Sequence, residues 1–142
     1  MALVIRKLEW EGTVDTVATP RALEEIQSCL AALWSAHSDI PDQTRQEVSL
    51  AVSEVGTNII EYATKDGPIL LHMELRLTSE SIEIVFSDEG APAAVDLEAV
   101  AMPSDLAIRG RGLAIAKEVL DELAYSRDGG RNQWTLIRRR FA

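Results

Sequence analysis

The residues best placed to do chemistry together are acids and an amide within the stretch from Gln43 to Thr64. If this stretch is helical, side chains advance by about 100° per residue, and four polar residues share an arc of roughly 60°: Glu47, Glu54, Asn58 and Glu61. An amide one turn from a carboxylate suits a divalent cation bridged to phosphate, because the amide oxygen can coordinate the cation while the carboxylate accepts a proton or orients water. The alternative is a solvated face, although no Lys or Arg lies between Gln46 and Thr64 to pair with these acids.

Two glycine elements follow further along the chain. The first, Asp88-Glu89-Gly90, ends a strand-like segment and could form the floor of a base or sugar site, or only a turn. The second, RGRGL at 109–113, opens a helical segment whose free amides could bind phosphate. The sequence has neither a Walker P-loop nor the glycine spacing of a Rossmann fingerprint, so those two mechanisms are excluded.

The order of these elements resembles the Bergerat-type ATPase domain of the gyrase and histidine kinase superfamily. The closest likeness is to the small anti-sigma-factor serine protein kinases of the sporulation and general-stress type. The likeness runs from Glu47 to Ile137 and rests on four segments: SEVGTNIIEYA as the N-box, DEGAP as the first glycine box, GRGLAIAKEVLDELAY as the second, and GRNQWTLIRR as the closing strand.

The resemblance implies a role for each matched residue. Glu54 would be the general base that takes a proton from a target serine, and Asn58 would hold Mg²⁺ against the phosphates of ATP. Asp88 would bind the adenine amino group, and Gly90 would let the ring approach.

In the second glycine box, the resemblance implies that Gly110 and Gly112 give backbone amides to the phosphates, with Leu113 completing the motif. Arg109 and Arg111 are candidates to neutralise phosphate charge. The stretch 91–108 would be the ATP lid. Two positions depart from the superfamily pattern: Ala91-Pro92 stands where a second glycine is usual, and Thr135 lies near the place of an adenine-site threonine without a clear match.

The apolar pattern predicts an α+β fold, a two-layer sandwich whose mixed, largely antiparallel sheet is covered by helices on one face. Thr19 is the expected N-cap of the first helix, with Pro20 as its first residue. The expected helices are 20–37, 43–64 and 113–123, and the expected strands are 3–10, 69–77, 82–86, a short one near Tyr125, and 133–139 after a turn at 128–130.

The bulk properties predict one domain, residues 1–142, in the cytoplasm. A net charge of −9 argues against binding nucleic acid, and no apolar run is long enough to cross a membrane. The three arginines at 138–140 are expected on the solvent side of the last strand. Cys29 is the single cysteine, so an internal disulfide is excluded. Its side chain is expected to pack in the core.

Three functions remain open at this point. The first is a Mg²⁺–ATP-dependent serine protein kinase and anti-sigma factor that phosphorylates an anti-anti-sigma (STAS-domain) partner, binds a sigma factor in some pathways, and forms a homodimer. The second is a nucleotide-gated protein-binding module without kinase turnover. The third is an acidic α+β scaffold with no nucleotide, in which the three motifs coincide by chance.

Overall fold

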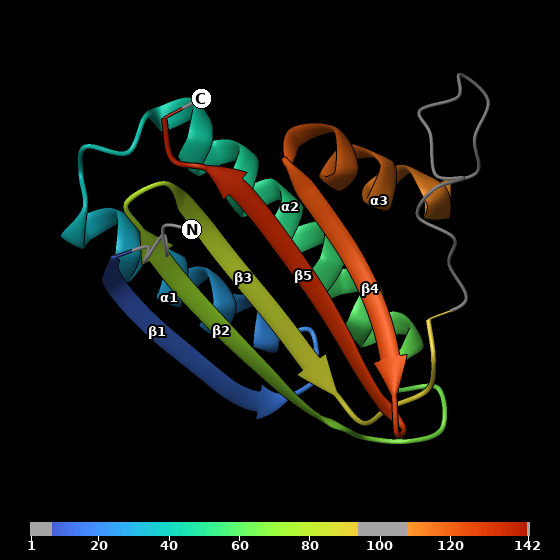
Figure 1. Cartoon of the computed structure of the whole chain (residues 1–142). Coiled ribbons are helices and arrows are strands. Elements are labelled where there is room, and N and C mark those ends of the chain that lie inside the picture. Colours follow the sequence, from blue (N-terminus) through green and yellow to red (C-terminus); the bar gives the residue numbers. More distant parts are fainter. Residues whose placement is uncertain (1–6, 94–107, 142) are drawn as a thin grey trace, which may run out of the picture.

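The computed structural model describes residues 7–93 and 108–141 (Figure 1). Its elements follow in the order β1 (Leu8–Val17), α1 (Ala22–Ala36), α2 (Asp42–Tyr62), β2 (Leu70–Thr78), β3 (Ser81–Asp88), α3 (Ile108–Val119), β4 (Glu122–Asp128) and β5 (Arg131–Arg139). Among the described residues, no helix combines the length and hydrophobicity needed to cross a bilayer.

The five strands form one sheet in the order β1-β2-β3-β5-β4, with the three helices on one face (Figure 1). The predicted α+β sandwich is confirmed, and every strand pairing in the described chain is antiparallel. The central hairpin of β2 and β3 and the long helix α2 lie within two residues of their predicted bounds. Their apolar periods of 2 and 3.6 residues are long and regular, which explains the agreement.

Alternation along each strand separates a buried face from an open one. In β2, the side chains of Leu71, Met73, Leu75 and Leu77 are buried, whereas Leu70 and Arg76 are exposed. The buried set packs with Phe86 and Trp134 of the neighbouring strands and with the apolar side of α2, which includes Val48, Val52, Val55 and Ile59. The core therefore lies between sheet and helices, and any site on the helix side must sit at its rim.

The predictions for the N-terminal part were wrong in two places. The first strand, predicted over 3–10, runs from Leu8 as far as Val17, because it pairs along its length with β2. Residues 3–6 of the prediction lie outside the described residues. The first helix begins at Ala22 with Arg21 as its N-cap, and Thr19 does not cap it. Thr19 instead belongs to a turn, in which its carbonyl accepts the Ala22 N–H at 2.8 Å.

The third helix also differs from its prediction of 113–123. It begins at Ile108, so the glycines of the second box lie within the helix, and it ends at Val119. The chain leaves the helix early because the Asp121 N–H donates to the Ile137 carbonyl at 2.9 Å and β4 then pairs with β5. Burial of Leu113 and Ala116 holds α3 in place despite the low helix propensity of glycine.

The arginines at the end of β5 are a further correction. Only Arg139 lies on the solvent side, whereas Arg138 and Arg140 are buried on the helix side. Arg140 forms ion pairs with Glu9 at 2.8 Å and Asp39 at 3.1 Å. Alternation along the strand makes this outcome unavoidable, since consecutive residues point to opposite faces.

Candidate functional site

The acidic side of α2 divides into three parts in the structure. At one end Glu47 pairs with Arg138 of β5, at 3.5 Å between Oε2 and Nη2, so this acid belongs to a structural ion pair. In the middle Glu54 and Asn58 are half-buried, and at the other end Glu61 is exposed. Glu47 is also partly buried, but its ion pair occupies it, so Glu54 and Asn58 are the two residues of this set that are partly buried and outside that pair.

Asp88 ends β3 with its side chain on the helix side of the sheet, 4% exposed. Its Oδ1 accepts hydrogen bonds from the Gly90 N–H and from Nδ2 of Asn132, both at 2.8 Å. Its Oδ2 is buried and has no hydrogen-bond partner within the described part of the chain. An orphaned buried acceptor is costly unless a ligand supplies a donor, so Asp88 fits a group such as an exocyclic amine.

Gly90 brings this carboxylate to the end of α2. A β-carbon at position 90 would overlap the carbonyl oxygen of Ala63 and lie 2.9 Å from its carbonyl carbon. The same carbonyl accepts the Ala91 N–H at 3.0 Å. The glycine is thus required by the backbone of Ala63, the C-cap residue directly after α2, a reason the sequence motif alone does not give.

Three residues beside Asp88 and Gly90 were not predicted as site residues from the sequence: Tyr125, Arg127 and Asn132. The amide of Asn132 is 2% exposed, and its Oδ1 accepts from the Tyr125 hydroxyl and from Nη1 of Arg127 at 2.7 Å. Arg127 also donates to the Gly90 carbonyl at 2.9 Å. The one available signal was an amide at an inward-facing position of the last strand. Thr135, the residue considered earlier, lies on the opposite face of β5.

The second glycine box meets α2 at Glu54. A β-carbon at Gly112 would overlap Oε2 of Glu54, so the bare backbone at this position leaves room for the carboxylate. Gly110 lies in the first turn of α3, where N–H groups lack intrahelical partners, whereas Gly112 lies in the second turn. Leu113 is 4% exposed and belongs to the core. The side chains of Arg109 and Arg111, and residues 94–107 of the expected lid, lie outside the described residues.

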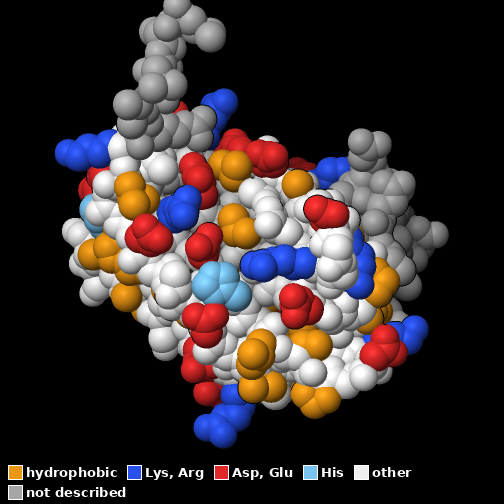
Figure 2. Space-filling view, turned by 60° about the horizontal axis from the view of Figure 1, so that its bottom comes forward, with side chains coloured by type: hydrophobic (Ala, Val, Ile, Leu, Met, Phe, Trp, Pro, Cys, Tyr) orange, Lys and Arg blue, Asp and Glu red, His pale blue; other side chains and the backbone are white. Residues whose placement is uncertain are grey.

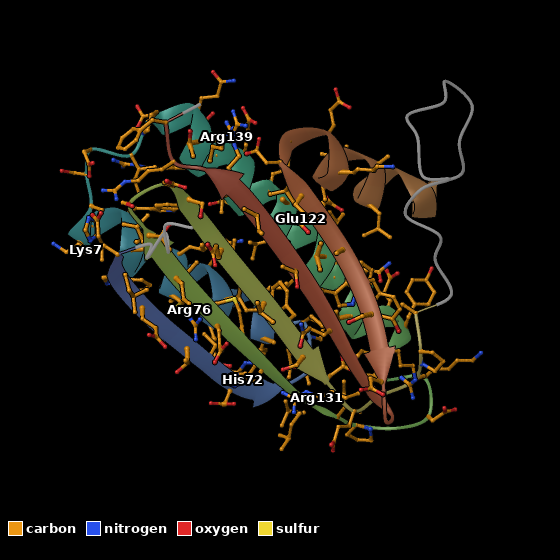
Figure 3. All side chains as sticks on the ribbon, viewed as in Figure 1. Lys7, His72, Arg76, Glu122, Arg131 and Arg139 are labelled. Carbon is orange, nitrogen blue, oxygen red and sulfur yellow. The ribbon has the colours of Figure 1, made fainter. Side chains whose placement is uncertain are left out.

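A shallow depression of about 420 Å³ lies elsewhere, on the open face of the sheet, and its lining includes Leu70, His72, Ser87 and Arg131. Figure 2 tips this end of the sheet forward and shows acidic and basic side chains interspersed with a few hydrophobic ones. The labelled His72 and Arg131 in Figure 3 lie there, on β2 and β5. The lining also includes Asp88 and Glu89 at the end of β3, so the depression reaches the first glycine box. Glu54, Asn58 and Gly90 do not line it.

The described residues hold no group of three or more His, Cys, Asp or Glu side chains arranged as a metal site. Mg²⁺ bound together with a nucleotide needs fewer protein ligands, since phosphates and water complete its octahedron. The oxygen atoms of Asn58 and Glu54, one turn apart on α2, are of the hard type that Mg²⁺ prefers.

The fold and the site together define an α+β nucleotide-binding domain with an orphaned acceptor at one end of α2 and an acid–amide pair along it. The family model for the histidine kinase-like ATPase domain matches residues 16–138, most of the chain. The chain therefore belongs to the histidine kinase-like ATPase domain family and is an ATP-binding domain of that type. No match to a curated protein was found.

Proposed function

We propose that this protein is an ATP-dependent serine protein kinase that acts as an anti-sigma regulatory factor in the cytoplasm and phosphorylates a STAS-domain partner. The observation that carries the proposal is the placing of two carboxylates, with Asp88 of β3 held near the end of α2 by Gly90 and Glu54 lying on α2 itself. One offers an unpaired buried acceptor, and the other a half-buried carboxylate beside the glycine box.

The spacing along α2 suits ATP. Gly90 packs on Ala63, and Glu54 lies nine positions earlier in the sequence. At about 1.5 Å per residue, this separation is roughly 13 Å along the helix axis, comparable with the reach of an extended nucleoside triphosphate from its base to its terminal phosphate. Asn58 lies between the two points, where Mg²⁺ would bridge the phosphates.

In this proposal each residue has one task. Asp88 accepts a hydrogen bond from the adenine amino group, and the first-turn amides of α3, Gly110 among them, face the phosphates. Asn58 supplies an oxygen to Mg²⁺. Bound ATP supplies the phosphoryl group that is transferred.

Glu54 acts on the acceptor. Its carboxylate takes the proton of a serine hydroxyl as the serine oxygen bonds to the γ-phosphorus, while the bond from that phosphorus to the β,γ-bridging oxygen breaks and ADP departs. The rest of the rate acceleration in such a transfer comes from positioning and charge stabilisation of the phosphoryl group.

The experiment is phosphoryl transfer from labelled ATP to a panel of STAS-domain proteins, with Glu54→Gln as the variant. A general base contributes about 10²- to 10⁴-fold, so Glu54→Gln is expected to bind ATP normally and to lose transfer by such a factor. Exposed Glu61→Gln on the same helix is the matched control and is expected to behave as wild type. If wild type binds Mg-ATP and a STAS-domain partner but transfers no phosphate, the kinase proposal fails and the nucleotide-gated module takes its place. If Glu54→Gln binds ATP and transfers phosphate at the wild-type rate, Glu54 is not the general base.

A further inference from the structure

We infer that Asn132 is a positioning residue that makes the base site selective for purines with a 6-amino group. It acts through Asp88 and does not need to touch the base. The inference rests on the proposed binding of adenine at Asp88. Its basis is the hydrogen bonding of the Asn132 amide, in which Nδ2 donates and Oδ1 accepts.

The donor end of Asn132 holds the carboxylate. Nδ2 donates to Asp88 Oδ1 at 2.8 Å and to the Ala91 carbonyl at 2.9 Å. Because the Gly90 N–H already donates to the same Oδ1, this oxygen has two donors and Oδ2 has none within the described chain. The carboxylate is therefore fixed so that Oδ2 is the oxygen left for a ligand.

The acceptor end of Asn132 fixes which way the amide points. Its Oδ1 accepts from Nη1 of Arg127, and a guanidinium can only donate. Reversing the amide would set its NH₂ group against Arg127 and its oxygen against Asp88 Oδ1. Tyr125 supports the same orientation, since its hydroxyl donates to Asn132 Oδ1 and accepts the Ala93 N–H at 3.0 Å.

A fixed acceptor discriminates between purines. The 6-amino group of adenine can donate to Oδ2, whereas the 6-oxo group of hypoxanthine or guanine would place a second acceptor against it. A buried polar group left unpaired by the wrong ligand gives strong discrimination, in contrast to a mismatch of size alone. If Asn132 did not hold Oδ1, the carboxylate could turn and accept the N1–H donor that hypoxanthine and guanine carry and adenine lacks, so the discrimination would fall.

The test compares dissociation constants for Mg-ATP and Mg-ITP, whose bases differ at position 6 and at the N1 proton. Wild type is expected to prefer ATP by about tenfold or more. Asn132→Asp keeps the shape and the acceptor for Tyr125 and Arg127, but it replaces the donor with a carboxylate oxygen that repels Asp88 Oδ1. The Asp88 carboxylate is then free to turn, and the ATP preference is expected to fall to less than about threefold. Gln133→Ala, the exposed neighbour on β5, is the control and should keep the wild-type ratio.

Tyr125→Phe is a second variant in case Asn132→Asp does not fold. It keeps the ring packed on Trp134, with centroids 4.8 Å apart, but removes the hydroxyl that orients the amide. It is expected to lower the preference for ATP, measured as the ratio of the dissociation constants of Mg-ITP and Mg-ATP, by about threefold. The inference would be overturned if the folded variants kept the wild-type ratio of dissociation constants, or if they lost affinity for both nucleotides equally. It would also be overturned if wild type showed no preference for ATP. Failure of wild type to bind either nucleotide would overturn the proposed function itself.

Discussion

The carboxylate of Glu54 on α2 occupies the space beside the backbone of Gly112 on α3 that a side chain at position 112 would need. A β-carbon there would overlap Glu54 Oε2 and lie 3.2 Å from its Cδ. The glycine box therefore has a second purpose besides any contact with phosphate, because it sets the position of the proposed base.

Gly112→Ala tests this relationship. The overlap falls on the end of a flexible side chain, so Glu54 can move aside at little cost in stability. Because alanine favours the helix by about 1 kcal/mol, the free energy of unfolding should be unchanged or higher. Phosphoryl transfer should fall by about 10- to 100-fold, since a displacement of 1 Å at a reacting group has effects of this size. Gly56→Ala, which contacts only Leu23 and Ile26 of α1, is the control and should keep full activity.

Gly90→Ala, in contrast, should lower the free energy of unfolding. Its β-carbon would overlap the backbone carbonyl of Ala63, which cannot move without shifting the end of α2. Overpacking of this kind costs about 1–3 kcal/mol, to be measured by urea unfolding. Pro92→Ala at the neighbouring exposed position should change stability by less than about 0.5 kcal/mol. Equal stabilities for the two variants would contradict the close approach of Gly90 to α2.

Arg140→Ala should destabilise the fold by about 3 kcal/mol, because it removes a buried guanidinium that pairs with Glu9 and Asp39 and donates to the Thr78 carbonyl. Arg139→Ala, with a side chain that is 74% exposed, is the matched control and should cost less than about 0.5 kcal/mol. Thermal or urea unfolding of the two variants gives the comparison. A similar cost for both would mean that β5 does not alternate as the structure has it.

Cys29 should react slowly with alkylating reagents. Cys29 is partly buried and packs against the edge of the core. This partial burial raises the pKa of its thiol, so at a given pH a smaller fraction is thiolate in the folded protein than in the unfolded chain. Folding therefore favours the protonated thiol, and this contribution to stability is lost as the pH rises through the raised pKa. Iodoacetamide labelling at pH 8, with and without denaturant, measures the difference. Equal rates in the two conditions would contradict the partial burial of Cys29.

The sequence was most informative where a pattern is long and local. The period of α2 and the alternation of β2 predicted both elements closely, and the matched motifs named Glu54, Asn58 and Asp88. The predicted start of α3 was wrong because glycine is usual at helix ends, and Gly110 and Gly112 were therefore placed before the helix. Core packing of Leu113 and Ala116 instead holds both glycines inside it. Gly56, in the middle of α2, is a further position that only tertiary packing explains, because a β-carbon there would lie 3.0 Å from Cδ2 of Leu23 on α1.

Asn132 could not be found from the sequence, because its partners come together only by strand pairing. Its place opposite Asp88 depends on the register between β3 and β5, and its place opposite Arg127 on the register between β4 and β5. No local pattern specifies either register to one residue. The same reason hid the ion pair between Glu47 and Arg138, which links a helix to the far end of the last strand.

The measurement that bears most directly on nucleotide binding at Asp88 is calorimetric titration of Mg-ATP into wild type and Asp88→Asn. The asparagine keeps the size of the side chain but can present an amide N–H where Oδ2 now offers only an acceptor. Wild type should saturate, and Asp88→Asn should bind at least about tenfold more weakly, while both unfold at similar urea concentrations. Equal affinity in the two proteins, or no binding by wild type, would contradict the assignment of Asp88 as the residue that holds the base.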